Sequence, residues 1–149
     1  MKSQLRHLLT LVCILTLCGG LTVPAEAINV EKTQRRASDY LAYYAVYAVA
    51  KPDGEILIEW DVQVTERMNL VGASCIIVQE KVGSKWIGVA TYFGSVSNGM
   101  LSDNASIHVN SISYYGTHGK EYRALATVYA ADDTGDDSRT IVTNSVIAK

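Results

Sequence analysis

The chain has 149 residues, of which 48% are hydrophobic, and a formal net charge of −2 at neutral pH. This length fits one domain, and the near-neutral charge gives no electrostatic basis for binding nucleic acid or an anionic membrane surface. Two of the three cysteines, Cys13 and Cys18, lie in an N-terminal leader, so Cys75 has no intrachain disulfide partner once the leader is removed.

Residues 1–27 have the order of a secretory signal peptide. A short basic start (1–7) precedes an apolar run over 8–17, and Ala25-Glu26-Ala27 is a small-x-small cleavage site. The apolar run is shorter than the about 20 residues that a membrane-spanning helix needs. Cleavage would release a secreted chain that begins at Ile28 and, having lost two basic residues and one acidic residue, carries a formal net charge of −3.

A lipoprotein is the alternative interpretation of this leader. Leu15-Thr16-Leu17-Cys18 would then be the modification site, and the thiol of Cys18 would carry the lipid. The signal peptide is preferred because the residue before a modified cysteine is normally small, whereas Leu17 is large.

Residues 28–38 are polar and of mixed charge, which predicts a flexible N-terminal arm. The remaining residues, 39–149, are predicted to form one domain of strands and turns. The first strand is predicted over Tyr40–Ala50, because aromatic and β-branched residues favour strand over helix. Lys51-Pro52-Asp53-Gly54 predicts a turn, since proline presets φ and glycine accepts a left-handed conformation.

The second strand has the clearest pattern in the chain. Apolar residues alternate with more polar ones from Ile56 to Thr65, which predicts one buried face and one solvent-facing face. The residues predicted to face the core are Ile56, Ile58, Trp60, Val62 and Val64. Those predicted to face solvent are Glu59, Asp61 and Gln63.

Five further strands are predicted in the rest of the chain: Ser74–Glu80, Trp86–Phe93, Ala105–Ser113, Tyr122–Ala130 and Thr140–Ile147. The first two form a hairpin around Val82-Gly83-Ser84. Loops rich in Gly, Ser, Asn and Asp separate the others. Seven short antiparallel strands in about 110 residues predict an all-β fold, a two-sheet immunoglobulin-like sandwich.

Two residues carry a resemblance to the immunoglobulin-like and fibronectin type III superfamily, over about 110 residues. Trp60 lies in the middle of the second strand, where such domains often have a core tryptophan, and Tyr122 lies at the start of the sixth strand, in the place of the tyrosine corner. The chain departs from fibronectin domains in having a single proline after the leader, Pro52. It departs from antibody domains in lacking paired cysteines.

A narrower resemblance rests on three stretches, Arg36–Leu41, Ile76–Glu80 and Gly135–Thr140. They are similar to an uncharacterised family of small secreted proteins from Gram-positive gut bacteria. That resemblance implies secretion but no activity.

The acidic segment 132–137 contains the letters of the aspartic-protease triplet, Asp133-Thr134-Gly135. That chemistry needs two carboxylates sharing a proton, and too few residues follow Gly135 to build the closing strands. We predict instead a non-catalytic hairpin loop joining the last two strands. Its four carboxylates are candidate calcium ligands, because Ca²⁺ prefers hard oxygen donors; they are Asp132, Asp133, Asp136 and Asp137. We prefer a solvated acidic loop without bound metal, and calcium binding is the alternative.

The other residues with chemical potential are isolated in the sequence. His108 and His118 are the two histidines after the leader, and two histidines without a third ligand do not define a zinc site. Cys75 lies in an apolar run and is predicted to be a buried filler, with an intermolecular disulfide as the alternative. Asn104-Ala105-Ser106 is a glycosylation sequon in a eukaryotic host. We predict no catalytic residue and no resident cofactor apart from the candidate Ca²⁺.

Nine tyrosines against one phenylalanine are the most suggestive feature of the composition. A tyrosine hydroxyl needs water or a hydrogen-bond partner, so tyrosine suits half-buried surfaces and is enriched at interfaces. In the first strand Tyr43 and Tyr47 share one face, and Tyr40 and Tyr44 share the other. Tyr43 and Tyr47 are therefore candidate contacts for a protein or glycan partner, with ordinary surface tyrosines as the alternative.

The function that this sequence favours is that of a secreted, non-catalytic binding or interaction module. A secreted structural or self-associating β protein, pairing through an exposed edge strand, is the second hypothesis. A secreted enzyme is the third, because a fold alone implies no chemistry.

The leader predicts where the mature chain begins. N-terminal sequencing of secreted material should read from Ile28, because signal peptidase cleaves after the small residues of Ala25-Glu26-Ala27. Intact-mass measurement of the same sample is the control for modification. A lipid-modified N-terminus at Cys18 would contradict both the cleavage site and release from the cell surface.

Overall fold

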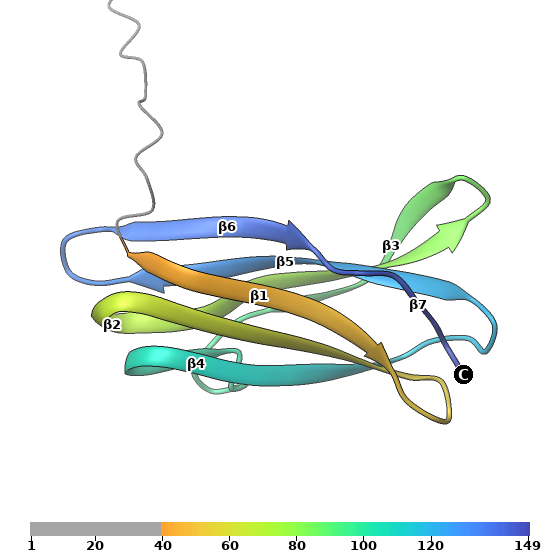
Figure 1. Ribbon diagram of the computed structural model, residues 1–149, viewed down its shortest axis with the longest axis horizontal. Coiled ribbons are helices and arrows are strands. Elements are labelled where there is room, and N and C mark those ends of the chain that lie inside the picture. The colour runs from red at the N-terminus through yellow and green to blue at the C-terminus, as the bar shows by residue number, and fades with distance from the viewer. Residues whose placement is uncertain (1–39) are drawn as a thin grey trace, which may run out of the picture. The chain divides into compact units, whose positions relative to one another are not determined.

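The computed structural model describes residues 40–149, so the predicted signal peptide (1–27) and N-terminal arm (28–38) lie outside the described residues. Residues 40–149 are all-β and contain no helix, hence none long and apolar enough to cross a membrane. Seven antiparallel strands form one curled sheet (Figure 1). Their bounds are β1 Leu41–Ala50, β2 Glu55–Val82, β3 Lys85–Phe93, β4 Leu101–Tyr115, β5 Glu121–Ala131, β6 Asp136–Val142 and β7 Val146–Ile147.

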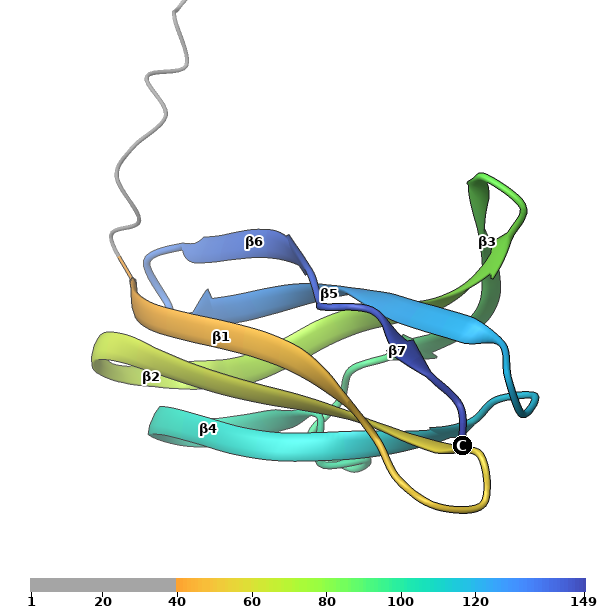
Figure 2. The ribbon, with the colours of Figure 1, turned by 45° about the vertical axis from the view of Figure 1, so that its right-hand side comes forward.

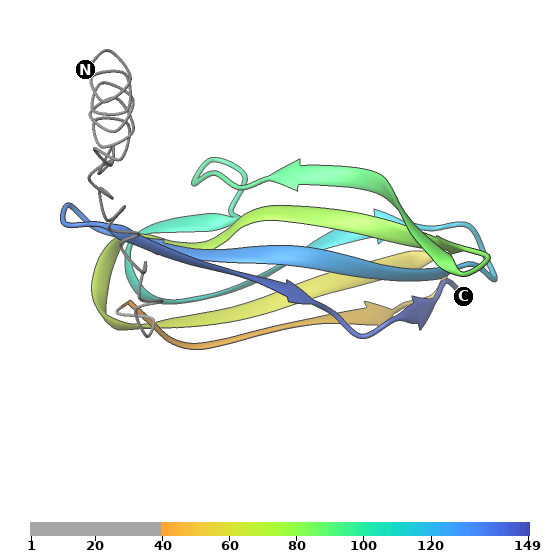
Figure 3. The same ribbon diagram turned by 90° about the horizontal axis from the view of Figure 1, so that it is seen from above.

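Strand β2 organises the sheet, because its 28 residues pair with four other strands. Its first half, to Gln63, lies between β1 and β4. Its second half, from Leu70, has β5 on one side and the beginning of β4, then β3, on the other. Strands β6 and β7 pair with the far edge of β5. The two halves of β2 run in opposite senses, and β2 turns back between them (Figures 1 and 3).

The burial pattern of β2 shows where the strand bends. Val64 and Met68 are buried, whereas the three residues between them are exposed, so the alternation of inward and outward side chains is interrupted there. The ladder with β4 also shifts register between Gln63 and Met68. Such an irregularity bends a strand and increases its twist, which allows one strand to serve both parts of the curled sheet.

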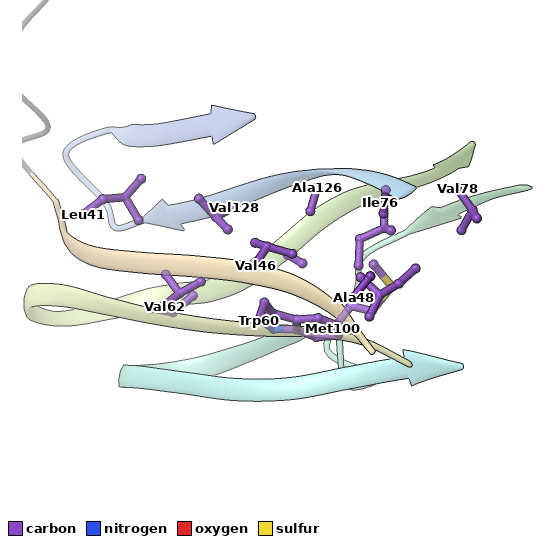
Figure 4. Packing of buried hydrophobic residues seen from close by; sticks show 14 of the residues in the cluster. Leu41, Val46, Ala48, Trp60, Val62, Ile76, Val78, Met100, Ala126 and Val128 are labelled. Carbon is purple, nitrogen blue, oxygen red and sulfur yellow. The ribbon is translucent and has the colours of Figure 1, made fainter. Parts of the chain in front are cut away.

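The core lies inside the curl and confirms the predicted alternation of β2. Ile56, Ile58, Trp60, Val62 and Val64 are all buried, and Glu59, Asp61 and Gln63 are partly exposed on the opposite side. Figure 4 shows Trp60 and Val62 of β2 and Val46 of β1 within one cluster that also contains Val128 of β5. The inward positions of β5 are equally regular and are occupied by Tyr122, Ala124, Ala126, Val128 and Ala130.

The structure corrects three predicted boundaries. The predicted strands 56–65 and 74–80 belong to the single strand β2, because β2 pairs with β4 both before and after the bend. Strand β4 begins at Leu101 rather than at Ala105. Strand β6 begins at Asp136, since Asp136 and Asp137 pair with Ala131 and Ala130.

The acidic loop is correspondingly shorter than predicted. It covers residues 132–135 and is closed by a hydrogen bond of 3.0 Å from the backbone N–H of Asp132 to the carbonyl oxygen of Gly135. The loop joins β5 to β6, so it does not connect the last two strands, because the short strand β7 follows β6 and pairs with the beginning of β5.

Side chains close the open edge of β1. The side-chain amide of Asn144, between β6 and β7, accepts from the N–H of Ala48 at 3.0 Å and donates to its carbonyl oxygen at 2.9 Å. A primary amide offers the same donor and acceptor pair as a peptide group, so Asn144 occupies the position of a neighbouring strand. Near the other end of β1, the hydroxyls of Tyr40 and Thr134 are 2.8 Å apart.

The hydroxyl of Tyr122 is held by backbone a few residues upstream and by a carboxylate of β2. This buried hydroxyl accepts from the N–H of Thr117 at 2.9 Å and donates to Glu80 Oε2 at 2.8 Å. Hydrogen bonds from Lys120 and then from Tyr122 lower the pKa of Glu80. A side chain at Gly116 would have its Cβ 2.6 Å from the Tyr122 ring, so only glycine fits beside it.

The alternation of β2 leads to a matched pair of substitutions. Trp60→Ala should destabilise the fold by about 3–5 kcal/mol, because truncating a buried tryptophan leaves a cavity, and this is a large share of the usual stability of a domain. Gln63→Ala, on the outward side of the same strand, should change the free energy of unfolding by less than about 0.5 kcal/mol. Urea unfolding measures both, and equal losses would mean that the register of β2 is wrong.

Candidate functional site

The outward side of β1, β4 and the first half of β2 carries one continuous set of tyrosine, aliphatic and acidic side chains, of which the acidic ones are partly exposed. Directly opposed residues of antiparallel strands lie on the same side of a sheet. The ladders therefore place Tyr47, Glu59 and Ser111 in one row across the three strands. We call this surface the tyrosine–acid face; its members are Tyr43, Ala45, Tyr47, Glu55, Leu57, Glu59, Asp61, Gln63, Ile107, Val109, Ser111, Ser113 and Tyr115.

The structure places both predicted tyrosines on this face. Tyr43 is 49% exposed and Tyr47 is 44% exposed, and four residues of extended chain separate them by about 13 Å. Tyr44 points to the other side of β1, where it is opposite the core residue Val62. The predicted shared face of Tyr43 and Tyr47 is thus confirmed. Tyr40 precedes β1, and the register shift between Leu41 and Tyr43 interrupts the alternation that predicted Tyr40 on the same face as Tyr44. The role of Tyr43 and Tyr47 in binding stays a prediction.

Strand β4 supplies the exposed aliphatic part of the face, which the sequence analysis missed. Ile107 is 57% exposed and Val109 is 63% exposed, and they lie opposite Gln63 and Asp61 of β2. Tyr115, at the end of β4, is opposite Glu55. Apolar residues occur at both odd and even positions of this strand, so periodicity alone did not show which of them face outward.

Three carboxylates run along the middle of the face, on β2. Glu55 accepts from the Ser113 hydroxyl at 2.5 Å, and Asp61 accepts from the Gln63 amide at 3.4 Å. Glu59 lies between them along the strand, about 7 Å from Asp61, because alternate residues of a strand are spaced by that distance. These carboxylates give the centre of the face a negative potential that attracts cations.

The strand segments that build the face contain no lysine or arginine: none occurs in 41–50, 55–64 or 105–115. The basic residues that border them lie outside the face. Lys51 is in the turn after β1, and Arg67, at the bend of β2, donates to the carbonyl oxygen of Asn104 at 2.5 Å. The carboxylates of the face therefore have no basic neighbour within these segments.

The acidic loop uses its first aspartate to shape its own backbone. Oδ1 of Asp132 accepts from the N–H and the hydroxyl of Thr134, both at 2.7 Å, and from the N–H of Gly135 at 3.1 Å. These hydrogen bonds, led by the one from the Thr134 hydroxyl, lower the pKa of Asp132. Such an Asx turn is a common way for aspartate to stabilise a tight loop.

The other predicted calcium ligands point to separate partners. Asp133 accepts from the side-chain amide of Asn69 at 2.6 Å, and Asp137 forms an ion pair of 2.7 Å with Arg139. Asp136 is exposed. Across residues 40–149 no three His, Cys, Asp or Glu side chains are arranged so that they could hold a metal ion, so the structure does not bring the four aspartates together.

Cys75 is partly exposed rather than buried, which corrects the predicted filler role. The ladder between β2 and β5 shifts register between Ala73 and Cys75. This shift places Cys75 on the outward side, opposite Phe93 and Thr127, while Ala73 and Ile76 on either side of it face the core.

The two histidines have separate environments. Nδ1 of His108 accepts a hydrogen bond of 3.1 Å from the indole N–H of Trp60, and the two ring centroids are 5.9 Å apart. Partial burial lowers the pKa of His108, although a hydrogen bond to the backbone of Gly99 acts in the opposite direction. His118 lies exposed in the turn after β4, and Asn104, the residue of the sequon, is also exposed.

The surface chemistry is therefore concentrated on the tyrosine–acid face, where exposed rings, aliphatic side chains and carboxylates alternate across three strands. Such a surface can form ion pairs, cation–π contacts and apolar contacts with one ligand. Comparison of the chain with protein-family models, with curated proteins and with solved structures finds no match.

The contact between Trp60 and His108 predicts a pH-dependent stability. An imidazole with a lowered pKa in the folded state takes up its proton first in the unfolded chain. The contribution of the neutral imidazole to the free energy of unfolding is therefore complete above the ordinary pKa of about 6.5. It is lost as the pH falls through the lower pKa of the folded state. The melting temperature should thus fall between pH 7.5 and pH 5, above the range in which the carboxylates titrate.

The matched variants are His108→Gln and His118→Gln. The first should flatten the dependence of the melting temperature on pH over this range, whereas the second, in an exposed turn, should keep it. Thermal unfolding at half-unit pH steps measures both. A slope that survives in His108→Gln and disappears in His118→Gln would contradict the assignment.

Proposed function

We propose that the mature chain is a secreted, non-catalytic binding module and that it binds through the tyrosine–acid face. The observation that carries the proposal is the row of three carboxylates, Glu55, Glu59 and Asp61, between exposed tyrosines on β1 and exposed aliphatic residues on β4. These groups lie on an open sheet surface, which suits contact with a macromolecule over several residues.

The partner that this chemistry favours is an extended polypeptide segment rich in lysine or arginine. Alternate residues of an extended segment are about 7 Å apart, which is also the spacing of Glu59 and Asp61 along β2. Basic groups of such a segment would pair with the carboxylates and lie over the rings of Tyr43 and Tyr47. Their alkyl stems would pack against Ile107 and Val109.

For the fold that presents this face, we propose the immunoglobulin-like, two-sheet sandwich expected from the sequence. The bend of β2 and the change in its partners support two layers, one around each half of the strand. The hydroxyl of Tyr122 bonded to the backbone of Thr117 supports the same class. Trp60, buried in the middle of the first half of β2, is a further point of likeness.

The proposed function is tested with a fluorescent peptide that alternates lysine and serine, and with a glutamate–serine peptide as its control. The lysine peptide alone should bind, and its affinity should fall as salt is added, because exposed ion pairs are screened. The double variant E59Q/D61N should weaken binding at least tenfold. The double variant D133N/D136N removes the same charge from the β5–β6 hairpin, at Asp133 in the loop and Asp136 at the start of β6, and should bind as the parent protein does.

A panel of neutral oligosaccharides separates this proposal from glycan binding. If a neutral sugar binds and Tyr43→Ala abolishes that binding while E59Q/D61N retains it, the face is a glycan site and the cationic partner is wrong. Peptide binding that is unchanged in E59Q/D61N would show that the carboxylates of β2 take no part.

A further inference from the structure

The end of the β2–β3 hairpin projects beyond the strand that supports it. The last ladder pair between β2 and β5 joins Glu80 to Tyr122, whereas β2 and β3 continue to pair as far as Val82 and Lys85. The projecting hairpin leaves the rest of the sheet in Figures 1 and 2. We call residues 81–89 the hairpin arm.

The arm is apolar as well as basic. Val82, Ile87 and Val89 are 54%, 47% and 42% exposed. Trp86 is half-buried, with the guanidinium of Arg123 4.3 Å from its ring centroid and Nζ of Lys81 at 5.7 Å. A two-stranded hairpin is only marginally stable by itself, so these two cations over the indole help to hold the arm in its projecting position.

The charge at the arm is positive. Lys81 pairs with Glu121 at 2.6 Å, and Lys120 pairs with Glu80 at 3.0 Å. Lys85 is exposed, and its side chain has no hydrogen-bond or ion-pair partner within the described residues, whereas Arg123 is bonded to the neutral amide of Gln79. The arm and the residues beside it on β2 and β5 therefore carry four basic side chains and two acidic ones. The tyrosine–acid face, by contrast, has three carboxylates and no basic residue in its strands.

The tyrosine–acid face and the hairpin arm are thus opposite in charge. The tyrosine–acid face is the surface that we propose to bind a basic, partly apolar segment, and the arm is an exposed segment of that kind. The two surfaces belong to different halves of β2. The near-neutral total charge of the chain therefore conceals an uneven distribution, acidic on one surface and basic on another.

We infer that the partner of the tyrosine–acid face is the hairpin arm of a second copy of this chain. This inference rests on the proposed function and names its ligand. Lys85 meets the carboxylates of Glu59 and Asp61, and Val82 and Ile87, which the ladder places on the same side of the arm as Lys85, lie against Tyr43 and Tyr47. Because the two contacting surfaces differ, each pair leaves one arm and one face unoccupied, and the association continues head to tail.

Sedimentation velocity of the purified protein tests this inference over a hundredfold concentration range. The average mass should rise with concentration in 50 mM salt and return to the monomer in 500 mM salt, because the attraction is electrostatic. The face variant E59K/D61K and the arm variant K81E/K85E should each stay monomeric up to at least tenfold higher concentrations. The variant D133K/D136K of the β5–β6 hairpin, with the same charge change as the face variant, should associate as the parent does.

Mixing the two charge-reversed variants gives the decisive measurement. The basic arm of E59K/D61K should bind the acidic face of K81E/K85E, and the acidic arm of the latter should bind the reversed face of the former, so the mixture should associate again. A chain that carries all four substitutions should also recover association. Circular dichroism and thermal melts confirm that each variant is folded before it is measured.

The failures of this inference and of the proposed function are distinguishable. A protein that stays monomeric at all concentrations, yet binds the lysine–serine peptide through Glu59 and Asp61, excludes the second copy and leaves the binding face intact. A protein that fails to bind the peptide as well excludes both. Association that both charge reversals leave unchanged would place the interface elsewhere on the molecule.

Discussion

The hydrogen bonding of β2 on both of its edges is the constraint on which the rest of the structure depends. A strand of 28 residues can stay paired on both sides only if its partners change along its length. Here β1 and β4 pair with the first half, and β5, the beginning of β4 and β3 pair with the second. The change requires the bend around residues 65–67. The curl of the sheet, the enclosed core and the two outward surfaces all follow from that bend.

The alternation of apolar and polar residues along a strand predicted which side of that strand is buried. The alternation from Ile56 to Val64 identified the buried side of β2, and the position of Tyr43 and Tyr47 on one face followed from the same period of two. The continuity of β2 escaped prediction, because three exposed residues in succession resemble a loop when their ladder partners are unknown. The outward orientation of Cys75 depends on a register shift, which no composition signal reveals.

Only the part of the candidate site that depends on local sequence could be predicted. Tyr43, Tyr47 and all three of its acids lie on the β1–β2 hairpin, whose strands follow each other closely in the chain. Ile107, Val109 and Tyr115 reach the site through pairing between β2 and β4, which are distant in sequence. The acidic loop shows the opposite limit, because four aspartates that are close in sequence need not converge on one point in space. In the structure Asp132 instead accepts three hydrogen bonds within its own turn.

The shared strand also sets the order in which the molecule can fold. β1 and β3 are sequence neighbours of β2 and reach it through tight turns, so two hairpins can form early. The opposite edge of the first half stays vacant until Tyr115 has been made, and that of the second half until Ala131 has been made. Closing these long loops costs chain entropy before any contact repays it, and topologies dominated by such distant pairings fold in milliseconds to seconds rather than microseconds. During that interval β2 has a long edge of unpaired backbone groups beside an uncovered apolar side. Such an edge is the kind of template on which nascent β proteins aggregate.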